Sequence, residues 1–235
     1  MIPKKIHLSW NDKNILDSEF DLIKLGAQRL RSLNSNWEFS VHTDEEIIDY
    51  LRENMGVDFR LVENFHIVPK TDIWRLYKMY YEGGIYVDLD RLANVHLDTV
   101  ISDNVKQVLP TCRHYDFSHD IMISEPGNIL FANTIDLYLF RRKQGHHGVY
   151  FLGPQTYMHS VTYTFTQKII NTNPGEDVFL DLLDKLKSFS GLLIYEENPP
   201  YNTFIYRGKE IIEDHETMKR NFYKENGLKH WTGEW

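Results

Sequence analysis

The sequence feature that most constrains the fold is the stretch 71–90, TDIWRLYKMYYEGGIYVDLD, because its hydrophobic period changes halfway along. Apolar side chains recur at helical spacing in the first half, which predicts a helix capped at Thr71. Gly83-Gly84 predicts the end of this helix, since glycine readily adopts the left-handed conformation found at helix ends. The period then becomes two, which predicts a strand over 85–90.

Two carboxylates share one face of this predicted strand. Asp88 and Asp90 lie on that face, opposite the apolar face formed by Ile85, Val87 and Leu89. Two like charges with no cation between them repel each other unless water or a metal ion compensates them. A hard divalent cation with oxygen ligands is the natural bridge, and it often brings a phosphate with it.

The chain before this stretch alternates strands and helices. Strands are expected at 4–10 and 37–41, a helix at 17–33, and a further helix capped by Asp44. This order predicts an α/β domain with a mainly parallel central sheet flanked by helices. Ligands of such sheets bind beyond the carboxyl ends of the strands, so Trp10 is expected near the two aspartates. Later elements are expected at 105–109, 120–124, 128–143, 154–168, 176–188, 192–195 and 203–206.

Composition limits the classes of partner. The chain has 235 residues, the length of a single domain, and its 42% of apolar residues support a sizeable core. A net charge of −8 argues against nucleic-acid binding. The single cysteine, Cys112, cannot form an internal disulfide, and neither a signal peptide nor a membrane-spanning apolar run is recognisable. We therefore expect a cytoplasmic protein with no nucleic-acid partner and no membrane span, whose oligomeric state is open.

The central stretch resembles the signature of the DXD-containing sugar-transferase family. This family includes OCH1-like mannosyltransferases, many capsule and lipopolysaccharide glycosyltransferases, and the glucosylating domains of large clostridial toxins. Its pattern is (S/T)-D-x-x-R, a helix, and G-G-x-Y-x-D-x-D. Every fixed position is present: Thr71, Asp72, Arg75, Gly83, Gly84, Tyr86, Asp88 and Asp90. Weaker matches are IPKKIHLSW at the start, LGP at 152–154 and HWTGEW at the end.

The resemblance implies a GT-A-like (Rossmann-like) fold across residues 1–235. The nucleotide-binding part would be about 1–100, and the acceptor and lid part about 101–235. The implied activity is transfer of a sugar from a nucleotide diphosphate donor to a glycan hydroxyl, with retention of anomeric configuration, in polysaccharide biosynthesis. A UDP-sugar is favoured over a GDP-sugar, and the implied cofactor is Mn²⁺ or Mg²⁺.

The resemblance also implies roles for the motif residues. Asp90 would bind the metal directly, while Asp88 would contact the donor's ribose or sugar and reach the metal through water. Asp72 would accept hydrogen bonds from sugar hydroxyls, with Arg75 close by. The residues alone also fit a surface ion pair between Asp72 and Arg75. Trp10 either stacks on the nucleobase, as in the toxin branch, or packs in the core.

The C-terminal tail and a Gly-Pro pair supply the remaining candidates. His230 is the candidate third metal ligand, and imidazole suits Mn²⁺ better than Mg²⁺. Trp235 is the candidate lid contact to the diphosphate. Glu234 stands where relatives often have serine, so a serine contact to metal or phosphate is in doubt. Gly153 and Gln155 are expected near the acceptor and the donor sugar. On composition alone, the tail would be a floppy segment.

Two other functions compete with glycosyl transfer. A metal-dependent phosphohydrolase or nucleotidyltransferase could use the same two aspartates, although the chain lacks a phosphate-cradling glycine loop. An aromatic-rich, non-catalytic glycan-binding module would also fit the 14% of aromatic residues. The intact motif favours the glycosyltransferase. The donor sugar and the acceptor are open.

Overall fold

The structure is a computed structural model that describes residues 1–99, 101–112, 116–170, 175–198, 203–206, 209–214, 221, 224–225 and 227. Strands and helices alternate through the N-terminal part, as the sequence predicts. Its elements are β1 (Lys5–Ser9), η1 (Ile15–Asp17), α1 (Asp21–Leu33), β2 (Glu38–His42), α2 (Asp44–Met55), η2 (Gly56–Leu61), α3 (Ile67–Tyr81), β3 (Gly84–Val87), β4 (Arg91–Ala93) and η3 (Leu97–Thr99).

The later part adds strands in the middle of the sheet and a group of helices beside it. Its elements are β5 (Gln107–Cys112), β6 (Asp116–Phe117), β7 (Ile121–Ser124), α4 (Ile129–Lys143), α5 (Val149–Leu152), α6 (Pro154–Thr166), α7 (Glu176–Leu186), β8 (Leu192–Asn198), β9 (Thr203–Tyr206) and β10 (Lys209–Asp214). Among these, β6 and β10, together with β4, are strands that the sequence did not predict. Within the described residues, no helix combines the length and the hydropathy needed to cross a bilayer.

The central sheet has the strand order β2-β1-β3-β7-β5-β8. The pairs β2–β1, β1–β3 and β5–β8 are parallel, whereas β7 runs antiparallel to both β3 and β5. Beyond β8 the sheet continues through β9, β10 and β4 by antiparallel pairing. The expected α/β sheet flanked by helices is confirmed, and β7 makes it a mixed sheet.

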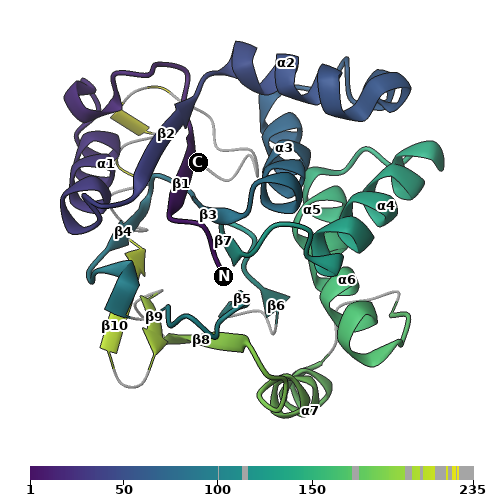
Figure 1. The fold of residues 1–235 in the computed structure, drawn as a ribbon. Helices are drawn as coiled ribbons and strands as arrows, with labels where there is room; N and C mark the ends of the chain where they lie inside the picture. The colour runs from purple at the N-terminus through teal and green to yellow at the C-terminus, as the bar shows by residue number, and fades with distance from the viewer. Residues whose placement is uncertain are drawn as a thin grey trace.

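Helices cover both faces of this sheet (Figure 1). One core cluster lies under α2, α3, α4, α6 and α7, and Tyr86 of β3 belongs to it. The other cluster lies under α1, and Ile85 and Val87 of β3 belong to it together with Leu89. The two faces predicted for the 85–90 strand are therefore confirmed, although β3 itself ends at Val87. Asp88 and Asp90 consequently follow the strand, at its carboxyl end.

The central helix α3 begins four residues before the predicted cap at Thr71, so that prediction is wrong. His66 is the N-cap and its ring accepts a hydrogen bond from the backbone of Val68, while Thr71 Oγ1 donates to Ile67 O at 3.1 Å. Pro69 lies in the first turn, where a missing N–H leaves no helical bond unmade. The extra turn brings Ile67 and Val68 to the wall of a pocket.

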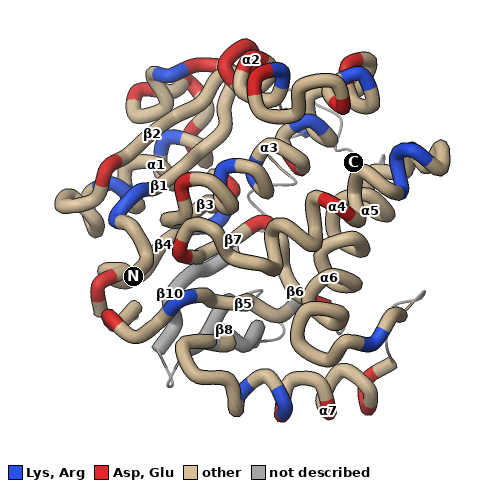
Figure 2. The backbone as a smooth tube through the Cα atoms, turned by 45° about the vertical axis from the view of Figure 1, so that its right-hand side comes forward, with Lys and Arg blue, Asp and Glu red and all other residues tan. Residues whose placement is uncertain are grey.

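Asp44 was predicted to cap the helix after β2, and this is also wrong. Thr43 is the N-cap of α2 and forms a capping box with Glu46, so Asp44 is the first helical residue. Three acidic side chains then occupy the first turn, where the helix dipole favours negative charge. Figure 2 shows acidic residues concentrated along α2. Because α2 follows β2 directly, its first turn lies at the carboxyl edge of the sheet.

The Gly83-Gly84 turn has the conformation that the sequence predicts. Gly83 has φ +63° and Gly84 has φ +93°, values that side-chain-bearing residues rarely adopt. A Cβ on Gly84 would lie 2.6 Å from Lys5 O of the neighbouring strand β1. Glycine therefore allows the chain to reverse from α3 into β3 while lying close against β1.

Candidate active site

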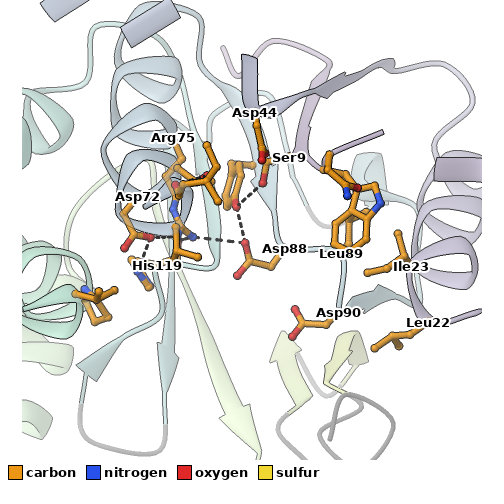
Figure 3. A pocket seen from close by; sticks show the side chains of 18 residues that line it. Ser9, Leu22, Ile23, Asp44, Asp72, Arg75, Asp88, Leu89, Asp90 and His119 are labelled. Atoms are coloured by element: carbon orange, nitrogen blue, oxygen red, sulfur yellow. Dashed lines mark hydrogen bonds and ion pairs between the residues drawn. The ribbon is translucent and has the colours of Figure 1, made fainter. Parts of the chain in front are cut away.

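A pocket of about 380 Å³ opens where β1 and β3 end and α3 begins. Figure 3 shows the polar side chains of Asp72, Arg75 and His119 on one side of Asp88, and the apolar side chains of Leu22 and Ile23 on the other. The pocket brings together five predicted site residues, namely Trp10, Asp72, Arg75, Asp88 and Asp90. It lies beyond the carboxyl ends of the parallel strands, where ligands of such sheets bind.

Asp72 and Arg75 form a buried ion pair on one face of α3, with side chains 4% and 6% exposed. A surface pair is therefore excluded. Burial raises the pKa of Asp72, but Arg75 and His119 outweigh it, so the pKa lies below its usual value. Arg75 Nη1 also lies 3.5 Å from Asp88 Oδ1 and donates to His119 O at 3.0 Å. One guanidinium thus joins the helix, the end of β3 and the loop before β7.

Asp88 is a carboxylate whose negative charge is disfavoured by its surroundings. Its side chain is 34% exposed and its Oδ1 accepts a hydrogen bond from Tyr86 OH. Burial raises the pKa of Asp88, and the negative charges of Asp90 and Asp120 raise it further, against the opposing effect of Arg75. A cation bound beside Asp88 and Asp90 would relieve this repulsion. The donor set of carboxylate oxygens suits a hard divalent ion.

Asp120 is also close to this carboxylate pair, but it is already compensated. Its side chain pairs with Arg91 and accepts a hydrogen bond from Ser118. Burial raises the pKa of Asp120, but these two contacts outweigh it, so the pKa lies well below its usual value. Its carbonyl accepts the backbone N–H of Asp88 at 2.9 Å. Asp120 therefore fixes the loop before β7 to the end of β3.

His119 is a site residue that the sequence reasoning missed. Its side chain is 18% exposed, and Nε2 lies 3.4 Å from Asp72 Oδ1. The only signal was a polar Ser-His-Asp run before an apolar strand. It becomes informative once β7 is known to pair antiparallel with β3, because β7 then starts where β3 ends.

Gly153 lies against the same two side chains. A Cβ at this position would be 2.8 Å from Asp72 Oδ2 and 3.2 Å from His119 Nε2. The following residue, Pro154, opens α6 as predicted and lines the pocket together with Val149. The Gly-Pro pair is thus beside Asp72, where the resemblance places the sugar.

The side of the pocket opposite Asp72 is apolar (Figure 3). Trp10 lines the pocket, packs edge-on against Phe20 with ring centroids 6.0 Å apart, and donates its backbone N–H to His42 O at 3.1 Å. Stacking of Trp10 on a base stays a prediction. Asp44, also missed as a site residue, lines the pocket without a hydrogen bond or ion pair in the described part of the chain. Burial raises the pKa of Asp44, as does Glu45.

The predicted tail residues, His230, Glu234 and Trp235, lie outside the described residues. In the part that the structure describes, no three His, Cys, Asp or Glu side chains are arranged to enclose a metal ion. Asp88 and Asp90 provide two carboxylates at the pocket, so any further ligands would come from elsewhere.

Part of the chain is similar in sequence to known proteins. Residues 21–106 match the family model described as a glycosyltransferase sugar-binding region containing a DXD motif. Inositol phosphoceramide mannosyltransferase 1 of Schizosaccharomyces pombe is 27% identical over 135 residues, which are 57% of this chain and 42% of that protein. Mannosyl phosphorylinositol ceramide synthase SUR1 of Saccharomyces cerevisiae is 24% identical over 136 residues, 57% of this chain and 34% of that protein. The chain thus spans less than half the length of these relatives.

A solved structure has the same fold. The PaToxG glycosyltransferase superposes with a TM-score of 0.56 at 20% sequence identity, covering 79% of this chain and 76% of that one. The GT-A-like fold expected from the sequence is confirmed, and so is the resemblance to the DXD-containing sugar transferases.

Proposed function

We propose that this chain, whose residues 21–106 match the model of a glycosyltransferase sugar-binding region containing a DXD motif, transfers a sugar from a nucleotide diphosphate donor to a glycan hydroxyl. One observation carries the proposal. Asp72, Arg75, Asp88 and Asp90 of the motif converge on a single pocket whose opposite end is apolar and contains Trp10. A nucleotide sugar is divided in the same way, with a flat base at one end and sugar hydroxyls at the other.

The pocket supports a specific placement of the donor. Its volume of about 380 Å³ lies in the range of small-molecule sites. The base would stack on Trp10, the diphosphate would lie at Asp88 and Asp90, and the sugar would reach Asp72. We assign donor binding mainly to residues 1–100, and the acceptor and lid to residues 101–235. Val149 and Pro154 of the later part line the sugar end, in keeping with this division.

A divalent ion, Mn²⁺ or Mg²⁺, would be held by Asp90 directly and by Asp88 directly or through water, with His230 as a further ligand. When bound, it would stabilise the negative charge that develops on the departing diphosphate. Arg75 keeps Asp88 oriented from the opposite side, and Tyr86 OH holds its Oδ1. These contacts fix the carboxylate before the donor arrives.

Retention of configuration would proceed by front-face displacement. Asp72 is paired with Arg75 and faces His119, so its carboxylate is a poor nucleophile. In the displacement, the acceptor oxygen bonds to the anomeric carbon as the bond from that carbon to the diphosphate oxygen breaks. The acceptor proton passes to the departing diphosphate. This course rests on the family resemblance as well as on the pairing of Asp72.

The donor and the acceptor are each narrowed to a few candidates. The resemblance favours a UDP-sugar, and the mannosyltransferase names of the relatives add mannose to the sugars worth testing. The acceptor would be a glycan hydroxyl, as in polysaccharide biosynthesis. The name of the Schizosaccharomyces pombe relative makes an inositol phosphoceramide a second acceptor to include.

The test is a screen of UDP- and GDP-linked sugars with Mn²⁺, followed by release of the nucleoside diphosphate. We expect at least one donor to turn over, and Asp90→Asn, which keeps the side-chain shape but removes the charge, to lower the rate at least a hundredfold. Equal activity of this variant and the unaltered protein would refute the proposal. Oxygen-18 from water appearing in inorganic phosphate would instead favour the phosphohydrolase.

A further inference from the structure

We propose that His119 binds the transferred sugar together with Asp72, a role that rests on the proposed glycosyl transfer and extends it. His119 stands in the short loop between β6 and β7, outside the DXD motif and outside the predicted site. It lines the pocket on the same side as Asp72 (Figure 3). The two side chains come from segments 47 positions apart in the sequence, so their approach is a product of the fold.

The imidazole has a hydrogen-bonding atom with no satisfactory partner. Nε2 lies 3.4 Å from Asp72 Oδ1, a long contact that helps to lower the pKa of Asp72. This nitrogen is buried, and it makes no hydrogen bond within the described part of the chain. A buried polar atom usually has a partner, so a ligand hydroxyl beside it would complete the site.

The backbone of the loop is fixed at the position that carries the imidazole. The carbonyl of His119 accepts a hydrogen bond from Arg75 Nη1 at 3.0 Å, and the next carbonyl, that of Asp120, accepts the N–H of Asp88 at 2.9 Å. The loop is thus bound to both elements that carry the motif. Such preorganisation is typical of a side chain that contacts a ligand.

Gly153 packs against this pair of side chains. A Cβ at this position would lie 2.8 Å from Asp72 Oδ2 and 3.2 Å from His119 Nε2, so the absence of a side chain lets the backbone pack directly against both groups. Asp72 and His119 line the pocket on the side of Asp88 opposite Leu22 and Ile23 (Figure 3), and Gly153 packs behind them. A sugar ring on that side would place its hydroxyls within reach of both polar side chains.

The pair matches the chemistry of a hydroxyl group. Ionised Asp72 can only accept hydrogen bonds, and His119, facing a carboxylate, favours the tautomer that donates from Nε2. A sugar hydroxyl both donates and accepts, so it can donate to Asp72 while it accepts from His119. Arg75 already compensates the charge of Asp72, so charge balance alone does not require the imidazole.

The experiment compares the binding of a nucleotide with and without its sugar. Calorimetry with Mn²⁺ measures UDP, GDP and the UDP- and GDP-linked glucose and mannose for the unaltered protein, His119→Ala and His119→Gln. His96→Ala is the matched control, because His96 is exposed and only its backbone carbonyl accepts described hydrogen bonds.

We expect His119→Ala to weaken binding of the nucleotide sugar about tenfold or more, the size of one lost hydrogen bond to a polar partner, and to leave nucleoside diphosphate binding within twofold. His119→Gln, which retains an N–H donor, should recover part of the loss. Equal weakening of both ligands would show a structural role and overturn the proposal, as would nucleotide-sugar binding unchanged in His119→Ala. If the unaltered protein binds no nucleotide of the panel, the proposed function fails and this inference fails with it.

Discussion

Arg75 is the residue on which the geometry of the site depends. It is buried, and it holds Asp72, the carbonyl of His119 and the end of β3 at Asp88 in one arrangement. A buried ion pair adds little net stability when intact, because both charges lose their hydration. Removing one partner is costly, because the other charge then stays buried and uncompensated.

This cost gives a prediction for Arg75→Met. We expect the free energy of unfolding to fall by about 3–5 kcal/mol, measured by urea denaturation, because Asp72 is left without its cation. The matched control is Arg52→Ala, whose ion pair with Asp49 has side chains 60% and 75% exposed. That change should cost less than about 1 kcal/mol. Similar losses for both variants would contradict the account of the buried pair.

Asp44 gives a prediction about the nucleobase. It lines the same pocket as Trp10, and a carboxylate can only accept hydrogen bonds. Uracil and guanine carry a ring N–H that can donate to it, whereas the corresponding ring nitrogen of cytosine is an acceptor. We expect calorimetry with Mn²⁺ to show UDP binding at least tenfold tighter than CDP, and Asp44→Asn to reduce this ratio. An unchanged ratio in the variant would remove Asp44 from base recognition.

At the scale of elements, the buried His7 and the half-buried His42, between the N-terminal strands and α3, couple stability to pH. Burial, with the positive charge of Lys78 as a second cause, lowers the pKa of His42 to about 4. His7 and the ring of Trp74 lie next to it, with ring centroids 5.8 Å and 5.0 Å away. The folded state therefore keeps His42 neutral at pH values where the unfolded chain would bind a proton.

The direction in which stability changes with pH follows from this difference in proton binding. Between about pH 6.5 and pH 4 the unfolded chain binds more protons, so stability falls as the pH falls through this window. We expect His42 to account for a loss of about 3 kcal/mol, and His42→Gln to flatten the profile. Urea denaturation at pH 7, 5.5 and 4.5 measures it. A variant with the same slope as the unaltered protein would contradict the assignment.

The sequence was most informative where local chemistry decides the structure. The Gly83-Gly84 turn, the two faces of β3 and the helix at Ile129–Lys143 follow from backbone freedom and hydrophobic period. The cap at Thr71 failed because Pro69 fits a first helical turn as well as it ends a preceding loop. Period and propensity alone do not separate these alternatives.

The parts of the site that the sequence did not predict depend on strand order. His119 is brought to Asp72 because β7 inserts antiparallel beside β3, a pairing between distant segments that no local pattern encodes. Asp44 reaches the pocket because β2 and β1 end at the same edge of the sheet. The motif residues were predictable because their helix, turn and strand are consecutive in the chain.

At the scale of the whole molecule, helices cover both faces of a mixed sheet (Figure 1). The pocket opens across the ends of β1 and β3. The N-terminal half supplies the carboxylates and the aromatic ring, and the later part supplies the wall at His119, Val149 and Pro154. The fold thereby separates the proposed site of the base from that of the sugar. The cytoplasmic location expected from the sequence stays a prediction.

The central claim is that a divalent ion at Asp88 and Asp90 joins the protein to the diphosphate of the donor. Calorimetric titration of UDP and GDP, with and without Mn²⁺, tests it most directly, in the unaltered protein and in Asp90→Asn. We expect binding of at least one nucleotide to require Mn²⁺ and to weaken at least tenfold in the variant. Binding that is equally tight without the metal, or unchanged in Asp90→Asn, would contradict the claim.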